Sequence, residues 1–247
     1  MTGYAATEGR RLPRGWAHLL LQFVIWMGFY VAYQVVRGHA DRDIFKAFMN
    51  GEWVITTERH LGALFEPSLQ HLIAGSRLLI DLTTYTYWLS QFAVVGLTLL
   101  WVYLRRHERF YQFRNTLILA NLMGLVGYIL VPTAPPRMFP FEGFKDVLAT
   151  TGVNHSSGLI ASIANQYAAM PSLHSMDAII VGLTMMALVR SWWAKTIWLL
   201  WAPWVWFSVM STGNHYWLDV VVGVAIAGLA YVVILSLRRG RLAPRAG

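Results

Sequence analysis

The sequence contains no cysteine, which excludes disulfides, thiolate metal sites and a cysteine nucleophile. Charged residues are scarce, because Asp, Glu, Lys and Arg make up only 13% of the 247 residues, against about 25% in soluble domains. Acidic residues are the rarer kind, with 12 against 20 Lys and Arg, so the net charge is +8. The basic residues lie between apolar runs, which favours a role in membrane orientation over binding of nucleic acid. These deficits exclude an ordinary soluble domain.

The chain is instead rich in apolar sequence. Hydrophobic residues make up 56% of it, and many of its 12 Trp and 11 Tyr lie near the ends of apolar runs, as in the aromatic belts of membrane proteins. The sequence therefore predicts an all-α, polytopic membrane protein built as a six-transmembrane-helix bundle. The expected spans are 16–36, 84–104, 115–131, 171–189, 196–211 and 216–237.

Two stretches between the spans have a different character. Residues 37–80 alternate charged and apolar side chains, which predicts two or three short interfacial helices between the first two spans. We expect breaks in them near Asn50-Gly51 and Pro67. Residues 132–170 form a polar loop of unusual length, and loops this long are commonly functional or disordered.

The charge distribution predicts the topology. Two basic tails, 1–15 and 238–247, flank a single catalytic membrane domain at 16–237. Six spans place both tails on one side, together with most of the arginines, while ten of the twelve acidic residues fall on the other side. The positive-inside rule then predicts cytoplasmic termini. We expect an integral protein of the plasma membrane in which 132–170 is an extracytoplasmic active-site loop.

Three polar segments lie at the ends of apolar runs, at 132–137, 170–174 and 212–219. Polar side chains at the mouth of a membrane helix carry a desolvation cost that lipid-facing packing does not offset. In the predicted topology all three segments lie on the non-cytoplasmic side, although the spans were assigned without them. We therefore expect them to form one site.

The third segment carries a candidate nucleophile. His215 and Asp219 are four residues apart, so a helix puts them on one face, where they can hydrogen-bond. A carboxylate on one ring nitrogen fixes the imidazole tautomer and leaves the other nitrogen free to attack. An isolated pair of this kind more often only joins helix ends, but a second histidine and an arginine at the same rim favour catalysis. The neighbours Asn214 and Tyr216 are possible substrate contacts.

The second segment opens the fourth span. His174 lies near its start and can act as a general acid that protonates a leaving oxygen. Ser172 and the free N–H groups at this helix start suit a phosphate, because the positive end of the helix dipole points there. Asp177, three residues after His174, can bond His174 or a substrate hydroxyl, and pairing with an arginine is equally compatible with its position.

The first segment supplies a cation. Arg137 follows two prolines, and its planar guanidinium can bind two phosphate oxygens at once. The alternative is an interfacial arginine that only reaches lipid headgroups. Lys145 and His155, in the same loop, are further candidates for the phosphate-binding role. Asn154-His155-Ser156 also matches a glycosylation sequon, a pattern that is frequent by chance.

These residue types together are typical of phosphoester cleavage through a phosphohistidine. His215 would attack phosphorus, His174 would protonate the leaving group, and Arg137 with backbone N–H groups would hold the equatorial oxygens. Water or an alcohol would then take the phosphoryl group, and no cofactor is expected. A metal enzyme uses similar residues, but the sequence has neither a His-Glu-x-x-His helix nor thiolate ligands.

The same segments resemble a known family. Residues 171–174 (Pro-Ser-Leu-His) and 215–219 (His-Tyr-Trp-Leu-Asp) resemble the second and third signature motifs of the type 2 phosphatidic acid phosphatase superfamily, six-helix membrane lipid phosphatases and relatives with a histidine nucleophile. Residues 133–137 (Thr-Ala-Pro-Pro-Arg), with the Thr-Gly-Asn-His form of the third motif, are similar to its inositol phosphorylceramide synthase branch. In that branch an inositol phosphate headgroup passes from phosphatidylinositol to a ceramide. The resemblance covers residues 115–222.

The resemblance implies roles for four residues: His215 as nucleophile, Asp219 as its orienting partner, His174 as acid and Arg137 as phosphate ligand. Two positions depart from the phosphatase pattern. Ser208 is followed by Val209 where that pattern has an arginine, and the lysine of its first motif is not recognisable. The implied substrate is a membrane phospholipid or polyprenyl-type phosphate. Transfer to a lipid alcohol, hydrolysis by a lipid phosphatase, and headgroup binding without catalysis all stay open at this point.

Overall fold

The computed structural model describes residues 12–39, 43–151 and 165–242. Within these ranges the chain is helical and forms no strand, which agrees with the predicted all-α class. The α-helices are α1 (Gly15–His39), α2 (Ile44–His60), α3 (Glu66–Ala74), α4 (Arg77–Leu89), α5 (Val95–Arg105), α6 (His107–Leu130), α8 (Leu173–Leu188), α9 (Trp192–Ser211) and α10 (Trp217–Leu242). A π-helical turn, η1 (Ser90–Val94), joins α4 to α5, and three 3-10 turns follow α6: η2 (Pro136–Met138), η3 (Pro140–Glu142) and η4 (Leu148–Thr151).

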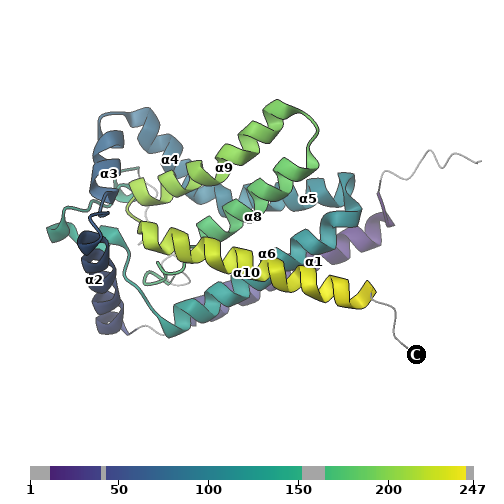
Figure 1. Ribbon diagram of the computed structural model, residues 1–247, viewed down its shortest axis with the longest axis horizontal. Coiled ribbons are helices and arrows are strands. Elements are labelled where there is room, and N and C mark those ends of the chain that lie inside the picture. Colours follow the sequence, from purple (N-terminus) through teal and green to yellow (C-terminus); the bar gives the residue numbers. More distant parts are fainter. Residues whose placement is uncertain (1–11, 40–42, 152–164, 243–247) are drawn as a thin grey trace, which may run out of the picture.

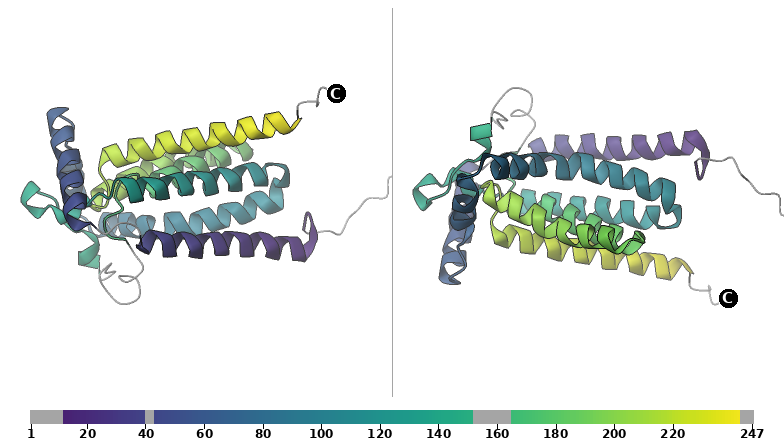
Figure 2. Two further views of the ribbon diagram at one scale, coloured as in Figure 1. Left: turned by 90° about the horizontal axis from the view of Figure 1, so that it is seen from below. Right: turned by 90° about the horizontal axis from the view of Figure 1, so that it is seen from above.

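The long helices run back and forth along one axis. Helices α1, α4 with α5, α6, α8, α9 and α10 follow the long dimension of the molecule, and α2 lies across one end of them, which we call the α2 end (Figure 1, Figure 2). Helix α1 begins and α10 ends at the opposite end, where the α5–α6 and α8–α9 turns also lie. The loop with η2 and η3, and the starts of α8 and α10, lie at the α2 end.

Four helical segments are long and apolar enough to cross a membrane: Gly15–Gly38, Arg77–Arg105, His107–Leu130 and Trp217–Arg239. Their outer faces expose large apolar side chains, such as Leu20 and Phe23 on α1, as expected for contact with lipid. The six-span count stays a prediction. Helix α8 has only 16 residues, a length of about 24 Å, which is shorter than the hydrocarbon core of about 30 Å.

The structure corrects two boundaries in the region between the first two long helices. Helix α2 runs through Asn50-Gly51 without a break. A Cβ atom on Gly51 would lie 2.7 Å from the Phe139 ring and 2.9 Å from the Ala134 carbonyl oxygen, so glycine there permits close packing of the loop on α2. The break before Pro67 is confirmed, since α3 begins at Glu66. The next long helix begins at Arg77, earlier than the predicted residue 84.

Helix α8 occupies the centre of the bundle. It packs against α5, α6, α9 and α10, and most of its residues are buried. Its first turn lies very close to α10, because a Cβ atom on Gly223 would be 2.5 Å from the Ser172 carbonyl oxygen. Side chains at the start of α8 therefore lie beside the start of α10.

Candidate active site

Backbone hydrogen bonds join the three polar segments at the α2 end. The Thr133 N–H donates to the Tyr167 carbonyl at 2.7 Å, beside the segment that leads into α8. The Arg137 N–H donates to the Gly213 carbonyl at 2.9 Å, and the Ser172 N–H to the Asp219 carbonyl at 3.0 Å. The structure thus brings together three segments whose bonded residues are up to 76 positions apart in the sequence, from Arg137 to Gly213.

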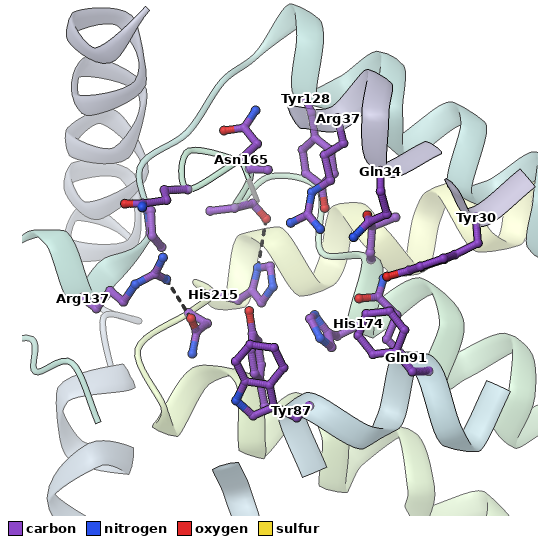
Figure 3. Close-up of a pocket in the computed structure, with 18 residues that line it drawn as sticks. Tyr30, Gln34, Arg37, Tyr87, Gln91, Tyr128, Arg137, Asn165, His174 and His215 are labelled. Carbon is purple, nitrogen blue, oxygen red and sulfur yellow. Dashed lines mark hydrogen bonds between the residues drawn. The ribbon is translucent and has the colours of Figure 1, made fainter. Parts of the chain in front are cut away.

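A cavity of about 360 Å³ opens where these segments meet (Figure 3). It is lined by 18 residues. Of the candidate site residues expected from the sequence, nine lie in the described ranges, and four of these line the cavity: Arg137, His174, Asn214 and His215. Helices α1, α4 and α6, the turn η1 and the segment that leads into α8 supply most of the remaining wall.

His215 is held by its Nδ1 atom. Nδ1 lies 2.9 Å from the Ala169 carbonyl oxygen and 3.3 Å from Oδ2 of Asp219. Both neighbours accept hydrogen bonds, so the proton sits on Nδ1 and the lone pair on Nε2. Within the described chain no hydrogen bond engages Nε2, and the ring lines the cavity. The Asp219 contact is the longer of the two, so the Ala169 carbonyl shares the orienting role.

The surroundings of His215 keep its ring neutral. Burial lowers the pKa of the His215 imidazole to about 3, and the positive charges of Arg137 and Arg37 act in the same direction, against the hydrogen bond to Ala169. The contact with Asp219 is therefore a hydrogen bond to a neutral ring. Asp219 is fully buried, and its Oδ2 atom also accepts the Tyr216 N–H at 2.9 Å. A neutral ring with a free Nε2 lone pair is the nucleophilic form of histidine.

His174 and Arg137 lie on other walls of the cavity. The His174 ring stacks on Tyr87 with centroids 4.4 Å apart, and its centroid is 5.6 Å from that of His215. Arg137 donates from one terminal nitrogen to Oδ1 of Asn214 at 2.7 Å, and its Nε lies 4.0 Å from Asp146. Both groups can reach a ligand bound at Nε2 of His215 (Figure 3).

The remaining expected residues do not line the cavity. Ser172 is fully buried and uses its hydroxyl to cap α8, accepting the Ser175 N–H at 3.2 Å. Asp177 accepts a hydrogen bond from Asn121 at 2.8 Å. The Tyr216 hydroxyl donates to the Ala134 carbonyl, and Lys145 has an exposed side chain and bonds Gln70 through its backbone. His155 and the sequon lie outside the described residues.

Several wall residues were missed by sequence reasoning: Tyr30, Gln34 and Arg37 on α1, Tyr87 and Trp88 on α4, Gln91 on η1, and Tyr128 on α6. In the sequence these residues lie within the predicted spans or in the charged and apolar stretch at 37–80. Gln34 and Arg37 are polar residues at the end of an apolar run, and this pattern could have indicated that α1 contributes to the site.

Two further carboxyl groups accept hydrogen bonds from backbone N–H groups at the start of α10. The Trp217 N–H donates to Glu66 at 2.7 Å, and the Leu218 N–H to Glu58 at 3.1 Å. Both glutamates are fully buried. Carboxyl groups at a helix start satisfy N–H groups that have no partner within the helix. Glu58 on α2 and Glu66 on α3 therefore fix the turn that links His215 to Asp219.

The protonation of this pair predicts a pH dependence of stability. Burial and the neighbouring Glu66 raise the pKa of Glu58 to about 9, and Asp219 acts in the same direction; burial also raises the pKa of Glu66. Above the ordinary glutamate pKa the unfolded chain has released this proton, whereas the folded protein still holds it. Stability therefore falls as the pH rises toward the pKa of Glu58 in the folded protein. We expect the unfolding temperature in detergent to fall as the pH rises from about 4.5, the ordinary glutamate pKa, to about 9, the folded value, and Glu58→Gln to remove most of that fall.

The matched control for this prediction is Glu52→Gln, on an exposed position of the same helix. It should keep the wild-type pH dependence. Thermal unfolding is measured across the same pH series. If the unfolding temperature depends on pH equally in wild type and Glu58→Gln, Glu58 is not a buried protonated carboxyl.

Fold and site together define a helical membrane protein in which His215, His174 and Arg137 line one cavity, with Asp219 bonded to His215 behind the wall. The chain belongs to the PAP2 superfamily, whose family model matches residues 52–233. This confirms the family that the motifs predicted.

Two individual proteins are similar to the chain. Phosphoinositol dihydroceramide synthase of Bacteroides thetaiotaomicron is 25% identical over 206 residues, which cover 78% of this chain and 64% of that protein. The chain therefore spans less than two thirds of that relative's length. Among solved structures, the crystal structure of Aquifex aeolicus LpxE matches with a TM-score of 0.47 and 18% identity, over 68% of this chain and 93% of the other.

Proposed function

We propose that the protein is an integral membrane enzyme that cleaves a lipid phosphoester through a phosphohistidine at His215 and passes the phosphate-bearing headgroup to a lipid alcohol. The observation that carries this proposal is the single cavity lined by His215, His174 and Arg137 (Figure 3). A neutral imidazole, a second imidazole and a guanidinium are the groups that phosphoryl transfer without a cofactor requires.

In the first half-reaction Nε2 of His215 attacks phosphorus, and the bond from phosphorus to the leaving alkoxide breaks. The proton on Nδ1 stays on the ring, and the Ala169 carbonyl and Asp219 accept hydrogen bonds from this N–H and stabilise the cation that forms. His174 gives its proton to the departing oxygen, so a neutral lipid alcohol leaves. Arg137 neutralises the charge on the phosphoryl oxygens.

In the second half-reaction His174 takes a proton from the acceptor hydroxyl. The acceptor oxygen attacks phosphorus, the P–N bond breaks, and His215 returns to its neutral form. A lipid alcohol as acceptor gives transfer, and water gives hydrolysis. The name of the Bacteroides relative points to phosphoinositol as the headgroup and dihydroceramide as the acceptor, so these are the first compounds to test.

We also propose six spans with cytoplasmic termini, which puts the cavity at the non-cytoplasmic face of the plasma membrane. The cavity lies at the α2 end, opposite the start of α1 and the end of α10 (Figure 2). Arg105, Arg106 and Arg190 lie beside the turns at that opposite end, the side on which the positive-inside rule expects basic residues.

The test is a mass-spectrometric assay of purified protein in lipid vesicles that contain phosphatidylinositol and dihydroceramide. We expect a phosphoinositol sphingolipid together with an equal amount of diacylglycerol. Free inositol phosphate with diacylglycerol would instead mean hydrolysis. Bound lipid without any cleavage, across a panel of phospholipids and polyprenyl phosphates, would mean a headgroup-binding protein and would refute the enzyme.

A further inference from the structure

Helix α1 contributes a polar face to the cavity although many of its apolar side chains are exposed. Tyr30, Gln34 and Arg37 line the cavity, and their spacing of four and three residues puts them on one side of the helix. In the most apolar window of this helix only 11% of residues are buried. The family model begins at residue 52, so α1 lies outside the part of the chain that defines the family.

Arg37 is the charged member of this face. Its guanidinium lies over the Tyr128 ring, 5.4 Å from the centroid. Its Nε atom is buried and has no hydrogen-bond partner among the described residues. A guanidinium has five N–H donors, and a buried donor without a partner costs free energy. Nε itself is closed off from the cavity, so a ligand bound there would meet the terminal nitrogens of Arg37, which line it.

The charges on the cavity wall indicate the sign of that ligand. Its 18 lining residues include two arginines and two histidines but no Asp or Glu. The nearest carboxylate to Arg137 is Asp146, at 4.0 Å and outside the lining. Asp177 and Asp219 lie behind the wall and bond to other protein groups. The described wall is therefore cationic, and an anion is its complement.

Arg37 and Arg137 both act on the nucleophile. Both side chains line the same cavity as the His215 ring, and the charge of each lowers the pKa of its imidazole. They come from different walls, Arg37 from α1 and Arg137 from the loop after α6 (Figure 3). A phosphodiester has two non-bridging oxygens, and one guanidinium on each wall matches them.

We propose that Arg37 is a second phosphate ligand, which binds one non-bridging oxygen of the lipid phosphodiester while Arg137 binds the other. This inference rests on the proposed function. It also accounts for the departure at Val209, where the phosphatase pattern has an arginine. Val209 is fully buried in an apolar cluster with Val205 and Ala202, so no guanidinium fits there and α1 supplies one from outside the motif.

The experiment measures orthovanadate binding by calorimetry with purified full-length protein in detergent, alongside headgroup transfer in vesicles. We expect Arg37→Ala to weaken vanadate binding by about tenfold to hundredfold, the usual effect of losing a charged hydrogen bond. Arg37→Lys should fall between, because it keeps the charge but loses the planar fork. Arg105→Ala, an exposed arginine near the opposite end, should bind as wild type does.

The outcomes separate this inference from the proposed function. If Arg37→Ala binds vanadate as tightly as the wild type, and headgroup transfer still depends on His215, the Arg37 subsite is overturned and the proposed function stands. If Arg37→Ala weakens vanadate binding but the wild type itself transfers no headgroup, the anion subsite is supported and the proposed function is refuted. A lower unfolding temperature with unchanged vanadate affinity marks Arg37 as structural and overturns the subsite.

Discussion

Replacing His215 with alanine is expected to lower headgroup transfer by about 10⁵-fold or more, because no other group in the mechanism can form the bond to phosphorus. Nε2 is the ring atom without a hydrogen bond in the described chain, and the pKa of the ring, lowered to about 3, leaves it unprotonated at any ordinary assay pH. No proton has to leave the nucleophile before it attacks. Transfer is measured as initial rates of lipid product in vesicles.

A second substitution separates chemistry from folding. His215→Asn keeps an N–H donor near the Ala169 carbonyl but removes the nucleophilic nitrogen, so it should unfold like wild type and transfer no headgroup. His60→Ala, an exposed histidine of α2, should retain full activity. In the wild type, rapid quenching at alkaline pH should trap the phosphoheadgroup on the peptide that contains His215. Activity retained in His215→Asn, or an adduct on another residue, would refute the assignment.

The parts of the site that the sequence predicted depend on local patterns. The spacing of four residues predicted the contact between His215 and Asp219, but not on a shared helix face, because α10 begins only at Trp217. Asp219, in the first turn, reaches back to the Tyr216 N–H and to His215. Ser172 is a good cap residue wherever it precedes a helix. The same cap explains why the expectation of a phosphate contact from the Ser172 hydroxyl has no support in the structure. Its oxygen already accepts the Ser175 N–H.

The parts that were missed depend on long-range packing. A backbone acceptor such as the Ala169 carbonyl has no residue-type signature. The wall residues of α1 and α4 were missed for another reason, because a helix that is apolar on most sides gives no pattern that fixes its rotation in the bundle. Glu58 resembles a surface charge in an interfacial helix, yet it is buried against an N–H group 160 residues away in the chain.

Replacing His174 with alanine is expected to lower transfer by about 10²-fold to 10⁴-fold, the usual contribution of a general acid. The size of the loss should depend on the leaving group. A lipid alkoxide is a strong base and needs a proton as it departs, whereas p-nitrophenolate departs without one. A synthetic donor with p-nitrophenol in place of diacylglycerol should therefore recover most of its cleavage rate in His174→Ala.

The comparison between donors distinguishes a proton donor from a residue that only shapes the cavity. His174 stacks on Tyr87 and lies 5.6 Å from the His215 ring, centroid to centroid, so its removal also takes away packing beside the nucleophile. Lost packing slows both donors equally, because it disturbs the attack of His215 and leaves the need for a proton unchanged. His215→Asn should be inactive on both donors, because both need the attack of His215 on phosphorus. Equal losses on the two donors in His174→Ala would therefore exclude acid catalysis by this histidine, and recovery on the activated donor alone would establish it.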